Sequence, residues 1–255
     1  MELGLKDKIA LVTGTGSQVG IGKAVALTLA REGCHVISCD LDLSGAEKTA
    51  AEVRALKRKS VAFKVDITDR NQVNKIIEEA LKQFSKIDIL ANIAGASFFT
   101  GPLIEAKLEA IDKEIGLNLT GAINTVKAVL PVMTKNKYGK IILISSDAAF
   151  FGIPGGSGYS AAKGGIMAFT RSIAREVGPF GININNICPG LVITNFYGGE
   201  GAPMLPPDVR AAGGNPLGKM VVPQDIANML AFLVSDVAGS ITGQCYVVDG
   251  GQVMD

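Results

Sequence analysis

Tryptophan is absent from the 255-residue sequence, and histidine occurs once, at position 35. The four cysteines form no CxxC pair, so we expect no Cys/His zinc site and assign no metal ligands. Because they stand in apolar or strand-like surroundings, we interpret them as small core residues of a reducing compartment. No run reaches the ~18 apolar residues of a membrane helix, and residues 1–8 lack the apolar segment of a signal peptide. The sequence therefore predicts a cytoplasmic protein with no membrane partner.

An excess of charge of one sign is also missing. Lysine and arginine total 25 and aspartate and glutamate total 24, so the net charge is +1. A dedicated nucleic-acid binder normally carries a clear basic excess, so we expect no nucleic-acid partner. Hydrophobic residues make up 47% of the chain, which is enough for a large core. We find no linker or internal repeat, and we expect a single domain over residues 1–255.

Short β-branched runs alternate with longer helical patterns along the chain. Such alternation, with nearly continuous apolar strands, predicts an α/β fold with a parallel sheet covered by helices on both faces. The Gly- and Pro-rich stretch 190–219 is too long for an ordinary loop, and we interpret it as a substrate lid, with disorder as the alternative. The expected strands are residues 8–13, 35–39, 61–65, 87–91, 140–145, 183–187 and 245–248. The expected helices are residues 23–32, 44–57 (capped by Ser44), 73–84, 105–135 (bent near Pro131), 159–177 and 224–234.

A glycine-rich turn, TGTGSQVGIG from Thr13 to Gly22, follows the first expected strand and opens a helix. Glycines let a backbone approach a pyrophosphate closely, and the helix start offers unpaired N–H groups. Asp40 ends the second strand, where a carboxylate can bind both hydroxyls of an adenosine ribose and repel a 2′-phosphate. We therefore predict NAD as the cofactor rather than NADP, although Asp40 can also be a simple turn residue. Asp66, after the third strand, either meets the adenine edge or caps a helix.

A second group of residues has the chemistry of proton transfer. Tyr159 and Lys163 are four residues apart, so they share one face of a helix. A lysine ammonium near a phenol favours the phenolate, which can exchange a proton with an alcohol or a carbonyl oxygen. Ser146 follows the fifth strand, and its hydroxyl can bind the same substrate oxygen. A tyrosine and a lysine at this spacing are more often a surface pair, but together with the glycine turn and Ser146 they indicate a catalytic site.

These motifs, taken in order, resemble those of the short-chain dehydrogenase/reductase family over essentially the whole chain. The resemblance implies a doubly wound, Rossmann-type sheet of about seven strands, a nicotinamide cofactor, a small-molecule substrate and usually a homotetramer, with a homodimer as the alternative. The matching residues are Thr15-Gly16-x-x-x-Gly20-Ile21-Gly22, Asn92-Ile93-Ala94-Gly95, Asn118, Ser145-Ser146, Tyr159-Ser160-Ala161-Ala162-Lys163, Pro189-Gly190, Thr194 and Asp249-Gly250-Gly251.

The resemblance also implies roles for individual residues. Tyr159 is the general acid/base, Lys163 holds the nicotinamide ribose, Ser146 orients the substrate oxygen and Asn118 supports a water-linked proton relay. Thr194 and the backbone at Ile193 contact the carboxamide. The complete set expected at the cofactor is Gly14, Gly16, Gly20, Ile21, Asp40, Asp66, Ile67, Asn92, Ala94, Gly95, Tyr159, Lys163, Pro189, Gly190, Ile193 and Thr194.

Two departures from the family pattern concern the cofactor side. The glycine turn is two residues longer than usual, so either Gly14 or Gly16 can take the position of the first glycine. Ile93 stands where the family commonly has a second asparagine, which removes a polar side chain but leaves the backbone contacts.

The substrate side is expected to be apolar. The residues expected around the pocket are Phe98, Phe99, Ala148, Phe150, Phe151, Phe196 and Tyr197, and core packing explains some of these equally well. We therefore predict an NAD-dependent dehydrogenase of an alicyclic or aryl secondary alcohol. The alternative is a hydroxyacyl-thioester dehydrogenase or ketoacyl reductase. Residues 146–149 resemble some ring-hydroxyacyl-CoA dehydrogenases, whereas ketoacyl reductases normally use NADPH, which Asp40 disfavours. A non-catalytic NAD sensor is the remote alternative.

Overall fold

Seven parallel strands form one sheet in the order β3-β2-β1-β4-β5-β6-β7. A computed structural model describes residues 2–98, 100–194 and 215–254. β1 and β5 are buried at every position because helices cover both faces of the sheet. The predicted fold class is confirmed, and each expected strand lies within two residues of its observed bounds. The strands are β1 Ile9–Thr13, β2 His35–Asp40, β3 Ser60–Lys64, β4 Ile89–Asn92, β5 Gly139–Ile144, β6 Ile182–Pro189 and β7 Cys245–Val248.

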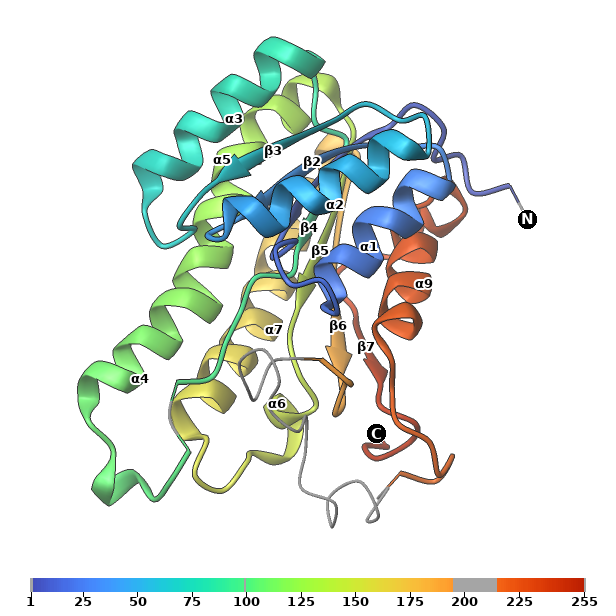
Figure 1. Cartoon of the computed structure of the whole chain (residues 1–255). Helices are drawn as coiled ribbons and strands as arrows, with labels where there is room; N and C mark the ends of the chain where they lie inside the picture. The colour runs from blue at the N-terminus through green and yellow to red at the C-terminus, as the bar shows by residue number, and fades with distance from the viewer. Residues whose placement is uncertain (1, 99, 195–214, 255) are drawn as a thin grey trace.

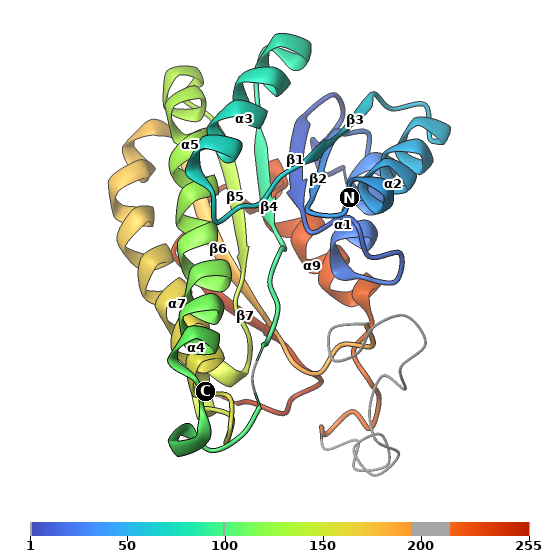
Figure 2. The ribbon, with the colours of Figure 1, turned by 60° about the vertical axis from the view of Figure 1, so that its left-hand side comes forward.

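The helices form two layers around this sheet. Figures 1 and 2 show α1 (Ile21–Arg31), α2 (Leu43–Ala55) and α9 (Pro223–Leu233) on one face. The other face is covered by α3, α5 and α7, and each face has its own apolar core cluster. The remaining helices are α3 Arg70–Phe84, α4 Leu108–Ile115, α5 Gly121–Asn136, α6 Ala148–Phe151 and α7 Ser157–Val177, with short turns at Leu103–Glu105, Gly178–Phe180 and Asp236–Ala238.

Two details of the predicted helices are wrong. The expected helix 105–135 starts only at Leu108 and contains a π-helical turn, Gly116–Thr120, between α4 and α5, whereas Pro131 lies inside α5. The N-cap of α2 is Asp42, whose carboxylate accepts a hydrogen bond from the Ser44 amide at 3.0 Å. Asp is as good an N-cap as Ser, so composition alone did not decide between neighbouring candidates.

The stretch Leu108–Asn136, which combines α4, the π-helical turn and α5, is the one described helical segment long and apolar enough to cross a membrane. Its mean hydropathy is only 1.2, and core helices of soluble proteins pass the same test. α5 also contributes Val126, Val129 and Met133 to the core under the sheet. This helix therefore gives weak support for a membrane span.

The order of the strands reverses at β1, which pairs with β2 on one side and with β4 on the other. The chain passes from β1 out to β3 and then returns to β4, so the loops after β1 and β4 diverge. Thr13 joins the two strand ends, because its Oγ1 accepts from the Ile93 and Ala94 amides at 3.0 and 3.1 Å. Ligands of doubly wound sheets bind in the crevice at this reversal, outside the carboxyl ends of the strands.

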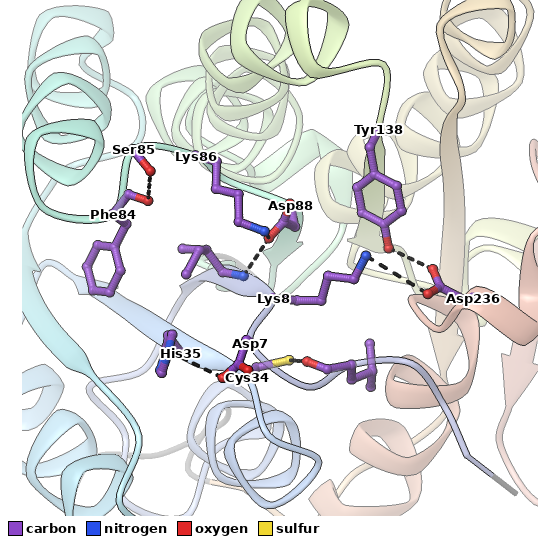
Figure 3. Close-up of polar contacts among 12 residues, drawn as sticks. Asp7, Lys8, Cys34, His35, Phe84, Ser85, Lys86, Asp88, Tyr138 and Asp236 are labelled. Carbon is purple, nitrogen blue, oxygen red and sulfur yellow. Dashed lines mark hydrogen bonds and ion pairs between the residues drawn. The ribbon is translucent and has the colours of Figure 1, made fainter.

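The amino ends of the strands are closed by polar groups that satisfy one another (Figure 3). Lys8 Nζ lies 3.8 Å from the centre of the Tyr138 ring, and the Tyr138 hydroxyl donates to Asp236 at 3.0 Å. Burial raises the pKa of Tyr138 above its usual value, and the hydrogen bond to Asp236 adds to the effect. Asp88 accepts from the Lys86 ammonium at 2.7 Å and from a β1 amide at 2.8 Å. These contacts stabilise the amino ends of the strands. The candidate site lies at the opposite, carboxyl ends.

Candidate active site

A cavity of about 700 Å³ lies at the carboxyl ends of the strands. It extends from Asp40 at the end of β2 to Tyr159 and Lys163 on α7. Fifteen of the predicted cofactor, catalytic and pocket residues line it: Gly14, Gly20, Ile21, Asp40, Asp66, Ile67, Ala94, Gly95, Ser146, Phe151, Tyr159, Lys163, Pro189, Gly190 and Thr194. The structure therefore brings together residues that the sequence separates by up to 180 positions.

The first glycine position belongs to Gly14. Its φ of +74° is in the left-handed region, and a Cβ there would lie 2.9 Å from the Ala94 nitrogen. A Cβ on Gly22 would lie 2.0 Å from the Gly14 carbonyl oxygen, so α1 starts directly against the end of β1. Among the described residues, no side chain caps α1 at Gly20. The first N–H groups of α1 are therefore available to an anion, and the turn fits the pyrophosphate of a dinucleotide.

The lengthened part of the turn, after Gly14, is held against β2 and α2 by hydrogen bonds. Thr15 donates its amide and hydroxyl to the Cys39 carbonyl, and its own carbonyl accepts from Thr49 on α2 at 2.8 Å. Gln18 donates to the Gly45 carbonyl at 3.1 Å. Gly16 does not line the cavity. The lengthened part of the turn therefore packs on α2 and leaves Gly14 and Gly20 beside the cavity.

Asp40 is held by this extended turn. Its Oδ2 accepts from the Gly16 amide at 2.7 Å, and its Oδ1 accepts from the Asp42 amide at 2.8 Å. Each carboxylate oxygen keeps a further lone pair. Asp66 also lines the cavity, but its Oδ1 accepts from the Thr68 amide and hydroxyl, and α3 is capped by Asp69. Asp66 is therefore a turn residue beside the cavity and not the helix cap.

Tyr159 and Lys163 lie on the face of α7 that points to the cavity. Lys163 is 3% exposed, its Nζ lies 5.5 Å from the centre of the Tyr159 ring, and it donates to the Ile144 carbonyl at 2.9 Å. Burial lowers the pKa of Lys163 from 10.5 to about 8. Ser145 fixes the helix here by donating to the Lys163 carbonyl at 2.8 Å. A buried cation is thus placed beside a phenol at the cavity wall.

Ser146 follows β5 and lines the same cavity. Its Oγ lies 3.0 Å from Asp147 Oδ1 and accepts from the Ala148 amide at 3.2 Å. Asp147 is buried in the cavity wall, and desolvation raises the pKa of its carboxyl group, with the charge of Asp249 adding to the effect. Asp147 is not among the site residues predicted from the sequence.

Asn118 lies in the π-helical turn between α4 and α5, and such turns are frequent at functional sites. Its Nδ2 donates to the Ala96 carbonyl at 2.7 Å, and its Oδ1 is buried with no donor among the described residues. A Cβ on Gly95 would lie 2.7 Å from this Oδ1 and 3.3 Å from Lys163 Nζ. Asn118 therefore stands behind Gly95, next to Lys163, with an acceptor atom left over, although it does not line the cavity.

Several predicted site residues lie elsewhere. Asn92 is buried beneath the cavity, where its Oδ1 accepts from Thr13 and Thr125, and the Ile193 amide donates to Val221 at 3.0 Å. Ala148 is fully buried behind the cavity wall, because it begins α6, and Phe98 is 50% exposed outside it. These four residues are therefore not among those that line the cavity. Phe99, Phe196, Tyr197 and most of the predicted lid fall outside the described residues.

The cavity has further lining residues that sequence reasoning missed. Thr13 ends β1 and is the first residue of the glycine-rich turn. Ile153, Leu191 and Gln252 come from loops whose approach depends on tertiary folding, and no local pattern marks them. Thr13, Ser17, Gly22, Ile93 and Ser145 belong to the motifs already described, although no separate role was assigned to them. The lining residues outside those motifs are Cys39, Leu41, Val65, Ala96, Leu117, Ile144, Asp147, Ile153, Leu191, Val192 and Gln252. No cluster of three metal-ligating side chains occurs within the described part of the chain.

A buried carboxylate on α4 holds the loop that follows β4. Glu114 is 1% exposed, and its Oε1 accepts from the Ser97 hydroxyl at 2.9 Å and the Phe98 amide at 3.0 Å. We expect Glu114→Ala to lower the free energy of unfolding by about 2–3 kcal/mol, because two donors lose a charged acceptor. We also expect a higher KM for substrate, since the same loop lines the cavity at Ala96. Chemical denaturation and steady-state kinetics measure both effects.

Glu109→Ala is the matched control, because Glu109 is exposed on the same helix. Equal stability of the two variants would contradict the role given to Glu114.

The comparisons with known proteins agree with this geometry. A family model described as enoyl-(acyl carrier protein) reductase matches residues 14–252. The 3-oxoacyl-[acyl-carrier-protein] reductase FabG of Thermotoga maritima is 33% identical over 98% of this chain and 99% of its own. A (2S)-[(R)-hydroxy(phenyl)methyl]succinyl-CoA dehydrogenase subunit of Thauera aromatica is 34% identical, covering 98% of both chains. The cyclohexanol dehydrogenase of a Rhodococcus species is 32% identical over 98% of this chain and 97% of its own. With its seven-stranded sheet, the chain belongs to the short-chain dehydrogenase/reductase family and is an oxidoreductase that uses a nicotinamide cofactor.

Proposed function

We propose that this protein interconverts 3-hydroxyacyl and 3-oxoacyl thioesters with NAD(H). The observation that carries the reaction type is the meeting of Tyr159, Lys163 and Ser146 in one cavity with the glycine turn. The thioester class is supported by the Thermotoga and Thauera relatives, a 3-oxoacyl-[acyl-carrier-protein] reductase and a (2S)-[(R)-hydroxy(phenyl)methyl]succinyl-CoA dehydrogenase subunit, which are both named for acyl thioesters. These relatives favour the thioester alternative over the free secondary alcohol that the sequence analysis preferred.

The bound nicotinamide would supply the hydride acceptor or donor, and the chain supplies the proton chemistry. In oxidation, Tyr159 takes the proton of the substrate hydroxyl, and in reduction it returns a proton to the oxygen. Lys163 stabilises the phenolate of Tyr159 through its nearby charge. Ser146 binds the substrate oxygen, on which negative charge develops. The backbone at Gly95 and Gly190 and the side chain of Thr194 form the wall against the cofactor.

Asn118 is proposed to take part in supplying protons to Lys163. Its Oδ1, which has no donor among the described residues, lies behind Gly95 next to Lys163, and a water molecule between the two groups is part of this proposal. Asp40 is proposed to select NAD, because its carboxylate lies where the adenosine ribose hydroxyls bind in this fold class.

A second candidate function is oxidation of a cyclic secondary alcohol. The cavity wall includes Phe151, Ile153 and Leu191, whose apolar side chains suit an apolar ring. The Rhodococcus relative is a cyclohexanol dehydrogenase, which supports this candidate.

The test is turnover of matched substrate pairs by the purified protein. We expect reduction of acetoacetyl-CoA with NADH and oxidation of 3-hydroxybutyryl-CoA with NAD to exceed turnover of cyclohexanone and cyclohexanol by at least about tenfold in kcat/KM. Turnover confined to the cyclic pair would replace the proposal with the second candidate. Binding of NADH without turnover of either pair would support the sensor alternative.

We propose that the protein is a cytoplasmic homotetramer. All four cysteines are free thiols, as a reducing compartment would keep them. Leu103 and Ile104, in the turn before α4, and Leu108, the first residue of α4, are all exposed, with Ile104 94% exposed. Such a patch favours contact with another subunit. Sedimentation equilibrium at micromolar concentration gives the mass, and a monomer would contradict the assembly.

A further inference from the structure

The hydrogen-bonding capacity of Ser146 is almost used up before any substrate binds. A serine hydroxyl has one proton to donate and two lone pairs. Its Oγ lies 3.0 Å from Asp147 Oδ1, and an ionised carboxylate can only accept, so Ser146 is the donor. The Ala148 amide occupies one lone pair at 3.2 Å. One lone pair is then left, which can accept from a substrate hydroxyl, whereas the Ser146 proton is donated to Asp147 and not to the substrate oxygen.

Asp147 is fixed in this position by the fold. It is the N-cap of α6, where its Oδ1 accepts from the Ala148 amide at 2.7 Å, and its own amide donates to the Pro189 carbonyl at 3.0 Å. A Cβ on Gly190 would lie 3.4 Å from Asp147 Oδ2, so the second oxygen faces the loop after β6. Asp147 is 7% exposed, and its carboxylate is held by the bonds from Ser146 and Ala148.

We propose that Asp147 is a positioning residue for the reaction: its carboxylate competes with the substrate oxygen for the Ser146 proton, and neutralising it frees that proton for the substrate. This inference rests on the proposed function only in requiring a hydroxyl and carbonyl pair to react at Ser146 and Tyr159. Negative charge develops on the substrate oxygen in the transition state, where a donated proton counts most. Oxidation and reduction share that transition state, so kcat/KM changes by the same factor in both directions.

The surroundings of Asp147 make this competition depend on pH. Burial and the carboxylate of Asp249 raise the pKa of Asp147, while the hydrogen bond from Ser146 lowers it. Tyr159 and Lys163 line the same cavity, and the Cys188 thiol on β6 is kept neutral by its own raised pKa. As the pH falls through the pKa of Asp147, the carboxyl gains a proton and becomes a weaker acceptor. Ser146 can then donate to the substrate.

The test uses Asp147→Asn and Asp147→Ala with acetoacetyl-CoA and NADH, or with cyclohexanone if only the cyclic pair turns over. An asparagine oxygen still caps α6 but carries no charge, so this variant mimics the protonated carboxyl. At pH 9 we expect both variants to have a kcat/KM about tenfold above that of the unchanged protein. For Asp147→Asn this ratio falls toward one as the pH is lowered. Asp112→Asn, an exposed site on α4, is the control.

If the role of Asp147 were only structural, its variants would have a lower kcat/KM than the unchanged protein at pH 9. Variants that are as slow as, or slower than, the unchanged protein at pH 9 would overturn the proposal, provided that NADH binding and thermal unfolding show them to be folded. A readout without turnover uses ¹³C-carboxyl NMR of labelled aspartate, assigned with Asp147→Asn. Ser146→Ala should raise the pKa of Asp147 by removing its donor. An unchanged value would also overturn the proposal, whatever the substrate of the protein.

Discussion

Replacing Tyr159 by phenylalanine is expected to lower kcat about 10³-fold while the dissociation constant for NADH changes less than about threefold. The substitution removes only the phenolic oxygen, so the ring still packs on α7 beside Lys163. Without that oxygen, the substrate proton must be exchanged with water, which is neither positioned nor activated. Stopped-flow measurement of hydride transfer gives the loss in rate, and fluorescence titration with NADH gives the dissociation constant.

Tyr138→Phe is the matched control for this experiment. Tyr138 lies at the amino ends of the strands, where its hydroxyl donates to Asp236 (Figure 3). This variant is expected to lose about 1 kcal/mol of stability and to keep its turnover. If Tyr159→Phe kept more than about a tenth of the normal kcat, another group would have to be the general acid/base, and the role given to Tyr159 would be wrong.

The sequence was sufficient for the parts of the site that depend on local spacing. Tyr159 and Lys163 are one helical turn apart, and Asp40 ends a strand, so period and strand order place them at one edge of the sheet. The glycine turn illustrates the limit of this reasoning. Gly14 and Gly16 have the same local signal, and only the contacts of Thr15 with Cys39 and Thr49 show which part of the turn packs on α2.

Contacts between distant segments explain most of the misses. Glu114 acts through Ser97 and Phe98, which local periodicity does not connect to it. Asp147 bonds to its neighbours Ser146 and Ala148, but its burial in the cavity wall depends on tertiary folding and has no signature in a single sequence. Ala148 was expected in the pocket. It is instead buried as the first residue of α6, whereas Phe151, the last residue of the same helix, lines the cavity.

The choice between the two nicotinamide cofactors is expected to depend on Asp40. We predict that kcat/KM with NAD exceeds kcat/KM with NADP by at least about 10²-fold. Asp40→Ser should reduce this ratio about 100-fold, because like charges held together cost several kcal/mol. The carboxylate is held by the Gly16 and Asp42 amides, so it cannot easily rotate away from a 2′-phosphate. Initial rates with each cofactor, at saturating second substrate, measure the ratio.

Asp42→Ser is the control, because Asp42 lies two residues away and serine also caps a helix well. Its ratio should stay within about twofold of normal. A preference for NADP in the unchanged protein would mean that the lengthened glycine turn shifts the ribose away from Asp40. In that case the carboxylate would serve mainly to accept the Gly16 amide, and Asp40→Ser would loosen the turn and weaken both cofactors equally. Asp40→Ser should raise kcat/KM with NADP if Asp40 recognises the cofactor and lower it if Asp40 only supports the turn. The variants Asp40→Ser and Asp42→Ser therefore decide between the two roles.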